Sequence, residues 1–567
     1  MEVCRGQSSG RSAGMRVAQA IAEILKREGV EFVVGYPVNL LYETCAELDI
    51  RTIVVRQERT AAHMADAYSR QNSGNKVGVF ICQHGPGAEN SFGGVAQAYS
   101  ESVPILVIPM GYQRRLMNVY PNFSSSLNYK HITKSCEHIT MGKATPEVMR
   151  RAFAQLRNGR PGPVLVEVPM DVFGEEVGDS LDYTPSFSTR SAPDPAAVKE
   201  VAEVLAKAER PVLYAGQGVH YAQAWPELKE LAELLSIPVT TSLEGKSAFP
   251  ENHPLSLGSG GRSLPQPVHE FMKEADLIFG IGCSFAQTGF GINMTTRGYL
   301  KGDNPAAVIH ATLDPNDLNR GIEVQHALVG DAQLTLQAVL DELKGRTCKP
   351  AEVRAKEVPG KIESIKKAWL EEWKPKRTSN EIPIDPYRVL HDLMETVDVE
   401  NTIITHDAGS PRDQLSPFWE SITPLSYMGW GKTTQLGYGL GLAMGAKLAH
   451  PERLCINVWG DAAIGFTGMD FETAVRERIP ILSILMNNFS MAVEIPIMKT
   501  STEKYGSTNI SGHYADMAKA FGGYGERVED PADIVSAIKR GIQATEDGTP
   551  ALLEFLTAKD FKYSVFS

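Results

Sequence analysis

The sequence predicts an α/β protein built of three doubly wound parallel-sheet domains. Short runs rich in Val and Ile alternate with longer apolar segments, and a Pro-rich break and a charged stretch divide them into three series. Strands that alternate with helices in this way form parallel sheets covered by helices on both faces. A chain of 567 residues is also too long for one hydrophobic core, which agrees with several domains.

The expected domain boundaries follow the breaks in this alternation. We expect a first domain over residues 15–185, a second over 193–345 and a third over 387–558. Residues 346–386 are charged and contain several prolines, so they are expected to form a linker. Residues 559–567 follow the third domain as a C-terminal tail.

The expected strands are short β-branched runs between turn-forming residues. The first helix is expected to begin at Met15 after a loose tail of residues 1–14, and the linker to contain one amphipathic helix near residues 362–373. The predicted strands are 31–34, 52–55, 77–82, 105–109, 164–168, 212–215, 238–241, 277–281, 307–311, 402–405, 454–458, 481–486 and 551–555.

The composition predicts a soluble enzyme of the cytoplasm. The net charge of -12 is spread along the chain, which argues against a nucleic-acid partner. The seven cysteines form no CxxC pair, so neither a disulfide framework nor a zinc site is expected. The longest apolar candidate, residues 436–449, is too short to span a membrane and contains Lys447, and residues 1–14 lack the apolar stretch of a secretory signal.

Two polar side chains follow expected strands of the third series. Asp461 comes after the strand at 454–458, and Asn488 after the strand at 481–486. The carboxyl ends of parallel strands meet at one edge of a sheet, where ligands bind. With the backbone carbonyl of Ser490, these side chains supply hard oxygen ligands suited to Mg²⁺. Either residue alone would more often cap a helix or form a turn, but the pair in this context favours a metal site.

The same stretch resembles the Gly-Asp-Gly to Asn-Asn signature of thiamine diphosphate enzymes. Ala462 stands where that family usually has Gly. The resemblance implies that Mg²⁺, held by Asp461, Asn488 and Ser490, binds the diphosphate of the cofactor, and that small residues let the backbone approach the phosphates. The cofactor-binding residues expected from this stretch are Gly460, Asp461, Ala462, Ala463 and Asn488.

A second part of the resemblance lies near the N-terminus. Glu58 follows the expected strand at 52–55 and precedes an expected helix over 60–70. The residues that match the family pattern after it are Ala62, Ala65, Asp66, Tyr68 and Arg70. The resemblance implies that Glu58 hydrogen-bonds to the pyrimidine N1′ of the cofactor and so promotes loss of the C2 proton. A Glu at such a junction, taken alone, would be interpreted as a helix start.

Two loops extend the resemblance. Residues 83–87 resemble a Gly-Pro-Gly turn of acetolactate synthases, with His84 in place of a small residue. His84 could give a proton to the substrate, and a structural, hydrogen-bonded His is an equal alternative. Residues 431–437 resemble the loop beneath the cofactor, which implies that Leu436 separates its two rings and that the carbonyl of Thr434 accepts from its amino group.

The second series contains a weaker pattern for a nucleotide. Its residues, at the ends of expected strands, are Gly216, Gly218, Gly282 and Asp314. Such turns can hold an ADP moiety, with the carboxylate on a ribose. Acetolactate synthases use FAD and carry an Arg soon after the second Gly pair, where this chain has Cys283 and Ser284. We therefore expect ADP or an empty site and regard FAD as doubtful.

The reaction is predicted from departures from acetolactate synthases. They carry a Phe-Gln pair where this chain has Phe123 and Ser124. Glu494 follows the metal-binding turn, where a carboxylic acid could exchange a proton with the substrate. The chain is also compatible with a branch of the family that is related to oxalyl-CoA decarboxylases, carries ADP rather than FAD and cleaves 2-hydroxyacyl-CoA thioesters. From this resemblance we predict a lyase that gives a carbonyl compound and formyl-CoA, with Glu58, Glu494 and His84 as its catalytic residues.

This prediction has structural consequences and alternatives. The tail, residues 559–567, would form a lid, and Arg114, Arg115 or Lys562 would meet the CoA phosphates. One alternative is an acetolactate synthase-like enzyme or another 2-oxoacid decarboxylase or carboligase; another, of a different class, is a non-catalytic cofactor-binding relative. The family resemblance also implies pyrimidine-binding, central and diphosphate-binding domains in that order. It implies a homodimer or homotetramer in which each active site lies between subunits.

Overall fold

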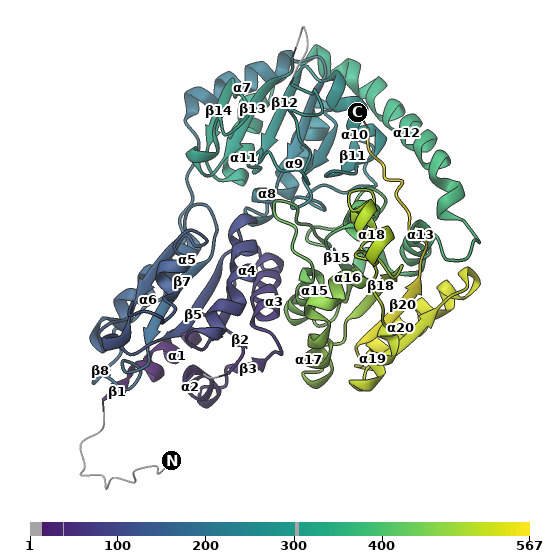
Figure 1. Cartoon of the computed structure of the whole chain (residues 1–567). Coiled ribbons are helices and arrows are strands. Elements are labelled where there is room, and N and C mark those ends of the chain that lie inside the picture. The colour runs from purple at the N-terminus through teal and green to yellow at the C-terminus, as the bar shows by residue number, and fades with distance from the viewer. Residues whose placement is uncertain (1–13, 38, 301–304, 567) are drawn as a thin grey trace, which may run out of the picture.

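The computed structural model describes residues 14–37, 39–300 and 305–566. Three six-stranded parallel sheets flanked by helices confirm the expected fold class (Figure 1). The predicted loose tail lies outside the described residues, apart from Gly14. The first helix begins at Val17 and not at Met15, because Met15 and Arg16 form a short strand.

The first domain follows that short strand. Its elements are β1 (Met15–Arg16), α1 (Val17–Arg27), β2 (Phe32–Gly35), α2 (Leu41–Glu47), β3 (Arg51–Val54), α3 (Glu58–Gln71), β4 (Gly78–Cys82), α4 (Pro86–Ser100), β5 (Ile105–Gly111), α5 (Ser125–Tyr129), β6 (Ser135–His138), α6 (Thr145–Arg157), β7 (Val164–Pro169) and β8 (Glu176–Gly178). The strand order is β3-β2-β4-β5-β7-β6, and β1 pairs with β8 in a separate antiparallel ribbon. The inner strands are fully buried, as a sheet covered on both faces requires.

The central domain repeats this architecture with its own sheet. Its elements are α7 (Pro195–Lys207), β9 (Pro211–Ala215), α8 (Gly218–Tyr221), α9 (Trp225–Leu235), β10 (Val239–Thr241), β11 (Ser256–Ser259), α10 (Gln266–Glu274), β12 (Leu277–Ile281), β13 (Ala307–Thr312), β14 (His326–Val329) and α11 (Ala332–Leu343). The strand order is β11-β10-β9-β12-β13-β14, and all neighbouring strands run parallel.

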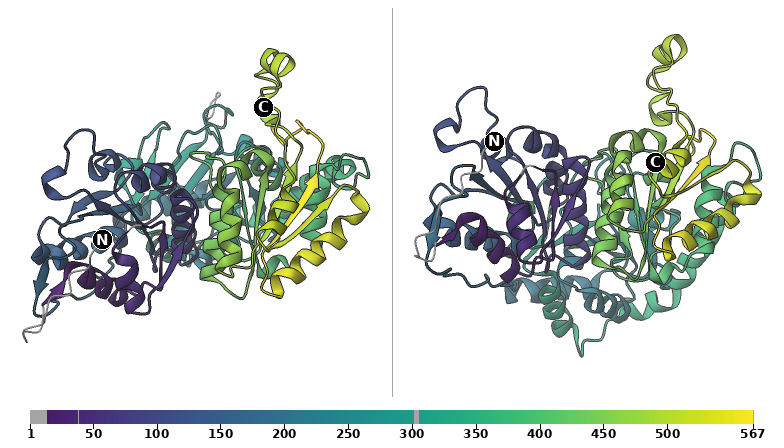
Figure 2. Two further views of the ribbon diagram at one scale, coloured as in Figure 1. Left: turned by 60° about the horizontal axis from the view of Figure 1, so that its bottom comes forward. Right: turned by 90° about the horizontal axis from the view of Figure 1, so that it is seen from below.

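The third domain carries the expected metal-binding stretch. Its elements are α13 (Pro386–Thr396), β15 (Thr402–His406), α14 (Ser410–Leu415), β16 (Tyr427–Met428), α15 (Tyr438–Ala449), β17 (Leu454–Gly460), α16 (Asp461–Thr467), α17 (Phe471–Arg476), β18 (Leu482–Asn487), α18 (Lys499–Tyr505), α19 (Tyr514–Ala520), β19 (Tyr524–Val528), α20 (Ile534–Glu546) and β20 (Ala551–Leu556). The strand order is β16-β15-β17-β18-β20-β19. The α18 helix stands away from the body of the molecule (Figure 2).

The linker is more regular than its composition predicts. One helix, α12 (Lys349–Arg377), spans most of it, although Pro359 and Pro375 lie inside. At its start, Arg354 donates to the carbonyls of Leu235 and Ala208 in the central domain. At its end, Trp369 stacks on Phe418 of the third domain at 4.7 Å. These contacts attach the linker helix to both domains. The short helix expected near residues 362–373 is only the second half of α12.

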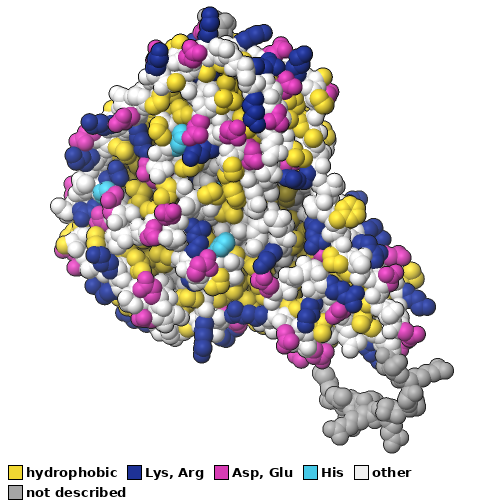
Figure 3. Space-filling view, turned by 180° about the vertical axis from the view of Figure 1, so that it is seen from behind, with side chains coloured by type: hydrophobic (Ala, Val, Ile, Leu, Met, Phe, Trp, Pro, Cys, Tyr) yellow, Lys and Arg dark blue, Asp and Glu magenta, His cyan; other side chains and the backbone are white. Residues whose placement is uncertain are grey.

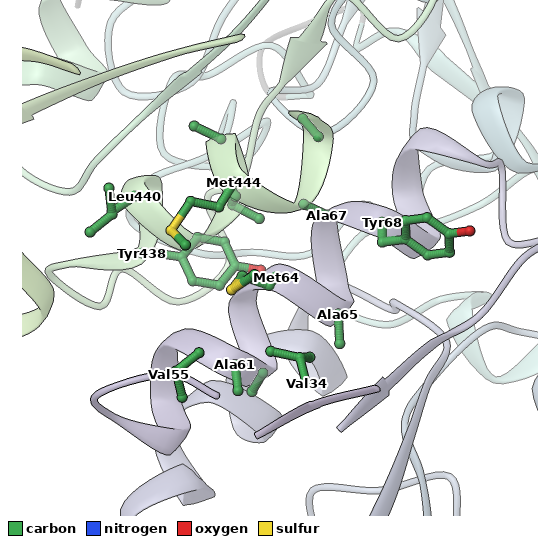
Figure 4. Packing of buried hydrophobic residues seen from close by; sticks show 14 of the residues in the cluster. Val34, Val55, Ala61, Met64, Ala65, Ala67, Tyr68, Tyr438, Leu440 and Met444 are labelled. Carbon is green, nitrogen blue, oxygen red and sulfur yellow. The ribbon is translucent and has the colours of Figure 1, made fainter. Parts of the chain in front are cut away.

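The first and third domains meet through α3 and α15. Buried residues of both helices, among them Met64, Ala67, Tyr438 and Met444, belong to one continuous core (Figure 4). The helices approach closely because α15 presents glycine: a Cβ on Gly445 would lie 2.3 Å from the carbonyl oxygen of Met64. Real Cβ atoms do not come so near a backbone atom, so this helix contact requires glycine at that position.

The C-terminal tail connects the third domain to the central domain. The hydroxyl of Tyr387 donates to the carbonyl of Lys562 at 2.7 Å. Further along, the backbone N–H of Leu264 donates to the carbonyl of Ser564, and the Ser564 hydroxyl donates back to the carbonyl of Leu264. The tail is therefore a strap bound to both domains, and its role as a lid stays a prediction.

The surface carries charges of both signs. Figure 3 shows Lys and Arg side chains interspersed with Asp and Glu over one face of the molecule. Among the described residues, no helix has the length and apolar character needed to cross a membrane. Location in the cytoplasm and the absence of a nucleic-acid partner stay predictions.

We expect the substitution Gly445→Ala to destabilise the protein, because the added Cβ must push α3 and α15 apart. Overpacking of this kind costs about 1–3 kcal/mol. Thermal unfolding of the purified protein measures the effect as a lower melting temperature. The matched control is Gly360→Ala in α12, where nothing lies within 4 Å of the added atom, so the higher helix propensity of Ala should leave stability unchanged or raised. Equal melting temperatures for the two variants would contradict the close contact.

Candidate functional site

A cavity of about 70 Å³ opens at the carboxyl edge of the third sheet. Its walls come from the loops after β15, β17 and β18, and Leu436 enters from the loop before α15. The strand order reverses direction between β15 and β17, so this is the switch point of the sheet. Ligands of open α/β sheets bind at such a point.

The predicted metal ligands meet in this cavity. Asp461 is buried, and its two carboxylate oxygens accept from the backbone N–H groups of Ala462 and Ser490, each at 2.9 Å. Phe489 has φ of 56°, a left-handed turn that brings the Ser490 N–H back toward Asp461. The side-chain oxygen Oδ1 of Asn488 is buried without a hydrogen-bond partner. A buried acceptor without a partner is costly and is explained where a ligand satisfies it.

This set of oxygens fits Mg²⁺ and a bound diphosphate. A carboxylate, a carboxamide and a backbone carbonyl are the hard donors that Mg²⁺ prefers. Burial raises the pKa of Asp461 despite several backbone hydrogen bonds, so a nearby cation would stabilise its ionised form. No cluster of three His, Cys, Asp or Glu that could bind a metal occurs in the described parts of the chain. A metal at Asp461 would therefore depend on the mixed oxygen set.

The backbone around Ala462 explains why alanine can replace the glycine of the family signature. The helix α16 begins at Asp461, and Ala462 lies in its first turn with its N–H on the Asp461 carboxylate. The backbone there is helical, so it does not require glycine. Gly460 and Ala463 also line the cavity, and a Cβ on Gly460 would meet only atoms at 3.8 Å or beyond. The alanine is therefore compatible with the proposed cofactor site.

The loop 431–437, called the cofactor loop below, places Leu436 in the cavity. It ends at Gly437, whose N–H donates to Asp407 at 2.9 Å, and the N–H of Gly439 donates to the same carboxylate at 2.8 Å. Burial raises the pKa of Asp407 to about 6, although backbone hydrogen bonds act against it. The sequence analysis missed Asp407, which follows a predicted strand just as Asp461 does. Thr434 belongs to the same loop but does not line the cavity.

Glu58 lies at the first residue of α3 and is largely buried. Its Oε2 accepts from the Nδ2 of Asn90 at 3.3 Å, and burial raises its pKa above the ordinary value for Glu. A carboxyl that retains its proton more readily can share it with a ring nitrogen. Glu58 and His84 do not line the cavity that contains Asp461. Arg59, the neighbour of Glu58, nevertheless donates to the carbonyl of Leu436 at 3.1 Å, so the start of α3 contacts the loop that enters the cavity.

His84 and Glu494 have contrasting surroundings. The ring of His84 packs edge-on against Tyr112 at 4.6 Å, and its Nδ1 is buried without a partner. Burial lowers the pKa of His84, which favours the neutral imidazole. Glu494 ends a short 3-10 helix, Ala492–Glu494, that lines the cavity, and its side chain is exposed. Glu494 is thus the predicted acid–base residue that shares the cavity with Asp461.

The central domain contains a larger cavity, of about 280 Å³. Gly218, Gly282 and Asp314 line it, whereas Gly216 does not. The glycines allow two turns to pack closely. A Cβ on Gly216 would lie 2.5 Å from the carbonyl oxygen of Gly282, and a Cβ on Gly218 would lie 2.7 Å from the Cα of Gly282. The Asp314 carboxylate accepts from the N–H of Asn316. The contact of Gly216, Gly218, Gly282 and Asp314 with a nucleotide stays a prediction.

Comparison with known proteins identifies the class of this chain. The thiamine pyrophosphate (TPP, thiamine diphosphate) enzyme N-terminal TPP binding domain matches residues 15–135, the central domain residues 198–339, and the C-terminal TPP binding domain residues 407–555. The chain belongs to the thiamine pyrophosphate enzyme superfamily, in its acetolactate synthase-like branch. The resemblance found in the sequence is thereby confirmed.

Similar proteins cover the chain almost from end to end. A probable acetolactate synthase large subunit of Methanococcus aeolicus is 31% identical over 569 residues, which cover 95% of this chain and 92% of the relative. A protein of the same description from Methanocaldococcus jannaschii is 29% identical over 96% of this chain and 92% of its own length. The acetolactate synthase isozyme 3 large subunit of Escherichia coli is 26% identical over 93% of this chain and 92% of its own length.

We expect Asp461→Ala to weaken the binding of thiamine diphosphate and Mg²⁺ by about 100-fold or more, because a charged metal ligand is lost. Calorimetric titration of the apoenzyme with cofactor at fixed Mg²⁺ measures the affinity. The control is Asp516→Ala, which removes an exposed carboxylate of α19 paired with Lys519. Parental affinity in the Asp461 variant would refute the metal site.

Proposed function

We propose that this chain is a thiamine diphosphate- and Mg²⁺-dependent enzyme that decarboxylates a 2-oxoacid and forms a carbon–carbon bond, as an acetolactate synthase-like carboligase. The observation that carries the proposal is the oxygen set of Asp461, Asn488 and Ser490 in one cavity with Leu436. The similarity to acetolactate synthase large subunits over nearly the whole chain supports this reaction class over others of the superfamily.

The chain's own residues would perform three tasks. Asp461, Asn488 and the Ser490 carbonyl would hold Mg²⁺ and through it the diphosphate, and Leu436 would support the cofactor between its rings. When bound, the cofactor would supply a carbon nucleophile for the carbonyl of a 2-oxoacid. Glu58 would hold a proton at the pyrimidine N1′, and Glu494 would exchange a proton with the substrate oxygen.

Two of the three cations expected to meet the CoA phosphates are already paired with carboxylates. Arg114 is paired with the carboxylates of Asp171 and Glu175 at 2.8 and 2.6 Å, and Lys562 with Glu372 at 3.2 Å. Arg114 and Lys562 are therefore not free to meet CoA phosphates, whereas Arg115 donates to Gln113 and has no ion pair among the described residues. The alternative stated from the sequence, an acetolactate synthase-like carboligase, is thus preferred.

The separation of Glu58 from the cavity of Asp461 supports an assembly of subunits. A proton relay needs the carboxylate within hydrogen-bond distance of the ring. Since Glu58 does not line the cavity of Asp461 in one chain, we propose that Glu58 of one subunit completes the site of the next in a homodimer or homotetramer. A non-catalytic relative would need neither the buried Glu58 nor the unsatisfied Asn488 oxygen.

For the central cavity we propose a nucleotide, ADP rather than FAD. The volume of about 280 Å³ and the lining by Gly218, Gly282 and Asp314 support a ligand of this size. Ser284 lines the cavity where the flavin-binding relatives are expected to carry an Arg.

We expect Glu58→Gln to keep the cofactor affinity near the parental value while kcat falls by about 10²- to 10⁴-fold, because Gln keeps the shape but cannot carry the proton. Steady-state kinetics and calorimetric titration on the same preparation separate the two effects. Glu43→Gln, an exposed position in α2, serves as the control. Turnover close to the parental rate would show that Glu58 is only a helix start.

We expect purified enzyme with thiamine diphosphate and Mg²⁺ to convert two pyruvates into acetolactate and CO₂, and to release no formyl-CoA from a 2-hydroxyacyl-CoA. The variant Glu494→Gln should retain cofactor affinity and lose turnover, because the amide cannot exchange a proton. Product analysis by mass spectrometry decides between the substrates. Formyl-CoA without acetolactate would reject the proposed reaction and restore the lyase.

A further inference from the structure

The cofactor loop is held at a point where all three domains meet. Glu101 follows the last turn of α4 in the first domain, Glu244 lies after β10 in the central domain, and Lys432 belongs to the cofactor loop of the third domain. We call these three residues the acid junction. The Oε1 of Glu101 accepts from the backbone N–H of Lys432 at 2.8 Å and from that of Gly431 at 3.2 Å. The first domain thus binds the backbone of the cofactor loop through the side chain of Glu101.

Other side chains of α4 hold the loop along its length. Gln97 donates to the carbonyl of Thr433 at 3.0 Å and accepts from its hydroxyl at 2.7 Å. Gln435 donates to the carbonyl of Gly93 at 2.7 Å. The loop is therefore bound to α4 from its start nearly to Leu436, the residue that enters the cavity. The position of Leu436 in the third domain therefore depends on contacts with α4 of the first domain.

The acid junction contains two carboxyls and one ammonium, so its net charge is zero only if one carboxyl keeps its proton. Glu101 is fully buried, and its Oε2 has no hydrogen-bond partner. The Nζ of Lys432 lies 3.8 Å from Oε1 of Glu244, and both side chains are largely buried. Two carboxylates that share one buried ammonium cannot both ionise without cost. Although burial acts against it, Lys432 lowers the pKa of Glu244, so Glu244 is the ionised member.

We propose that Glu101, in its neutral form, is a positioning residue for the thiamine cofactor: it fixes the start of the cofactor loop and so sets where Leu436 and Thr434 lie. The inference rests on the proposed cofactor site. Glu244 and Lys432 also line the central cavity, so the acid junction is where that cavity and the cofactor loop meet.

The proposal implies that the loop loosens in alkaline solution. Burial and then the charge of Glu244 raise the pKa of Glu101 to about 7, while Lys432 and Arg70 act in the opposite direction. Tyr221 and Tyr438 also interact with Glu101, and burial raises the pKa of both, so they remain neutral. Arg70 is already paired with Asp66 at 2.7 Å. Lys432 and Arg70 compensate a second carboxylate only in part, so ionised Glu101 would repel Glu244.

The test compares Glu101→Gln and Glu101→Ala with the parent enzyme. Calorimetry measures the affinity of each apoenzyme for thiamine diphosphate with Mg²⁺ below and above pH 7. We expect parental affinity to weaken as the pH rises, Glu101→Gln to keep tight binding on both sides, and Glu101→Ala to bind about tenfold more weakly on both sides. Hydrogen exchange of the Gly431 and Lys432 amides should be faster in the Ala variant even without cofactor.

A matched control separates positioning from general stability. Glu251 is also buried between two domains and accepts from the N–H of Ser421 at 2.8 Å, but its partners Lys246, Ser259 and Ser421 lie outside the cofactor loop. Glu251→Gln should lower the melting temperature and leave cofactor affinity unchanged.

Three outcomes would overturn these ideas in distinguishable ways. If the parent binds thiamine diphosphate and Glu101→Ala binds it equally well, the positioning role is wrong. If Glu101→Ala does not fold, Glu101→Gln still decides, since a parental pH dependence in that variant also rejects the role. If the parent itself binds no thiamine diphosphate with Mg²⁺, the proposed function fails, and with it the role of Glu101 toward the cofactor.

Discussion

The contact between α3 and α15 is the constraint on which the rest of the site depends. Glu58 begins α3, and the cofactor loop leads directly into α15, so the spacing of these helices sets the position of both. The spacing is small because Gly441 and Gly445 leave room for the backbone of α3. Within α3, Arg70 pairs with Asp66 and donates to the carbonyl of Gly429 at 2.9 Å. Across the contact, the hydroxyl of Tyr438 in α15 donates to the carboxylate of Asp66. A buried ion pair contributes little net stability, but its hydrogen bond to Tyr438 disfavours any other alignment of the two helices.

The predicted site is divided between parts of the molecule with different tasks. The carboxyl edge of the third sheet presents Asp461, Asn488 and Ser490 from loops after rigid strands, which suits a metal that demands fixed geometry. The first domain supplies Glu58 and, through Glu101, the support for the cofactor loop. A change in the first domain can therefore alter the third without touching any of the residues proposed to bind the metal.

The outer strands show where sequence patterns failed. The strands that the sequence analysis missed within the three sheets, β6, β11, β14, β16 and β19, all lie at sheet edges. Two of them, β6 and β14, are incompletely buried, and β6 lacks a continuous apolar run: it reads Ser-Cys-Glu-His and is only half-buried along its length. The buried β16 has only two residues, too few for a pattern to show. The inner strands were predicted within one or two residues because burial on both faces requires such runs.

The sequence by itself determined the fold class, the superfamily and the oxygen set around Asp461, because each depends on residues close together in the chain: a strand, the turn after it and the next helix. Tertiary structure alone decided that Glu58 lies apart from that cavity, that the central glycines pack two turns together, and that Glu101, Glu244 and Lys432 meet. These last residues come from three domains, and no local pattern records a contact whose energy depends on burial and charge brought together only by folding.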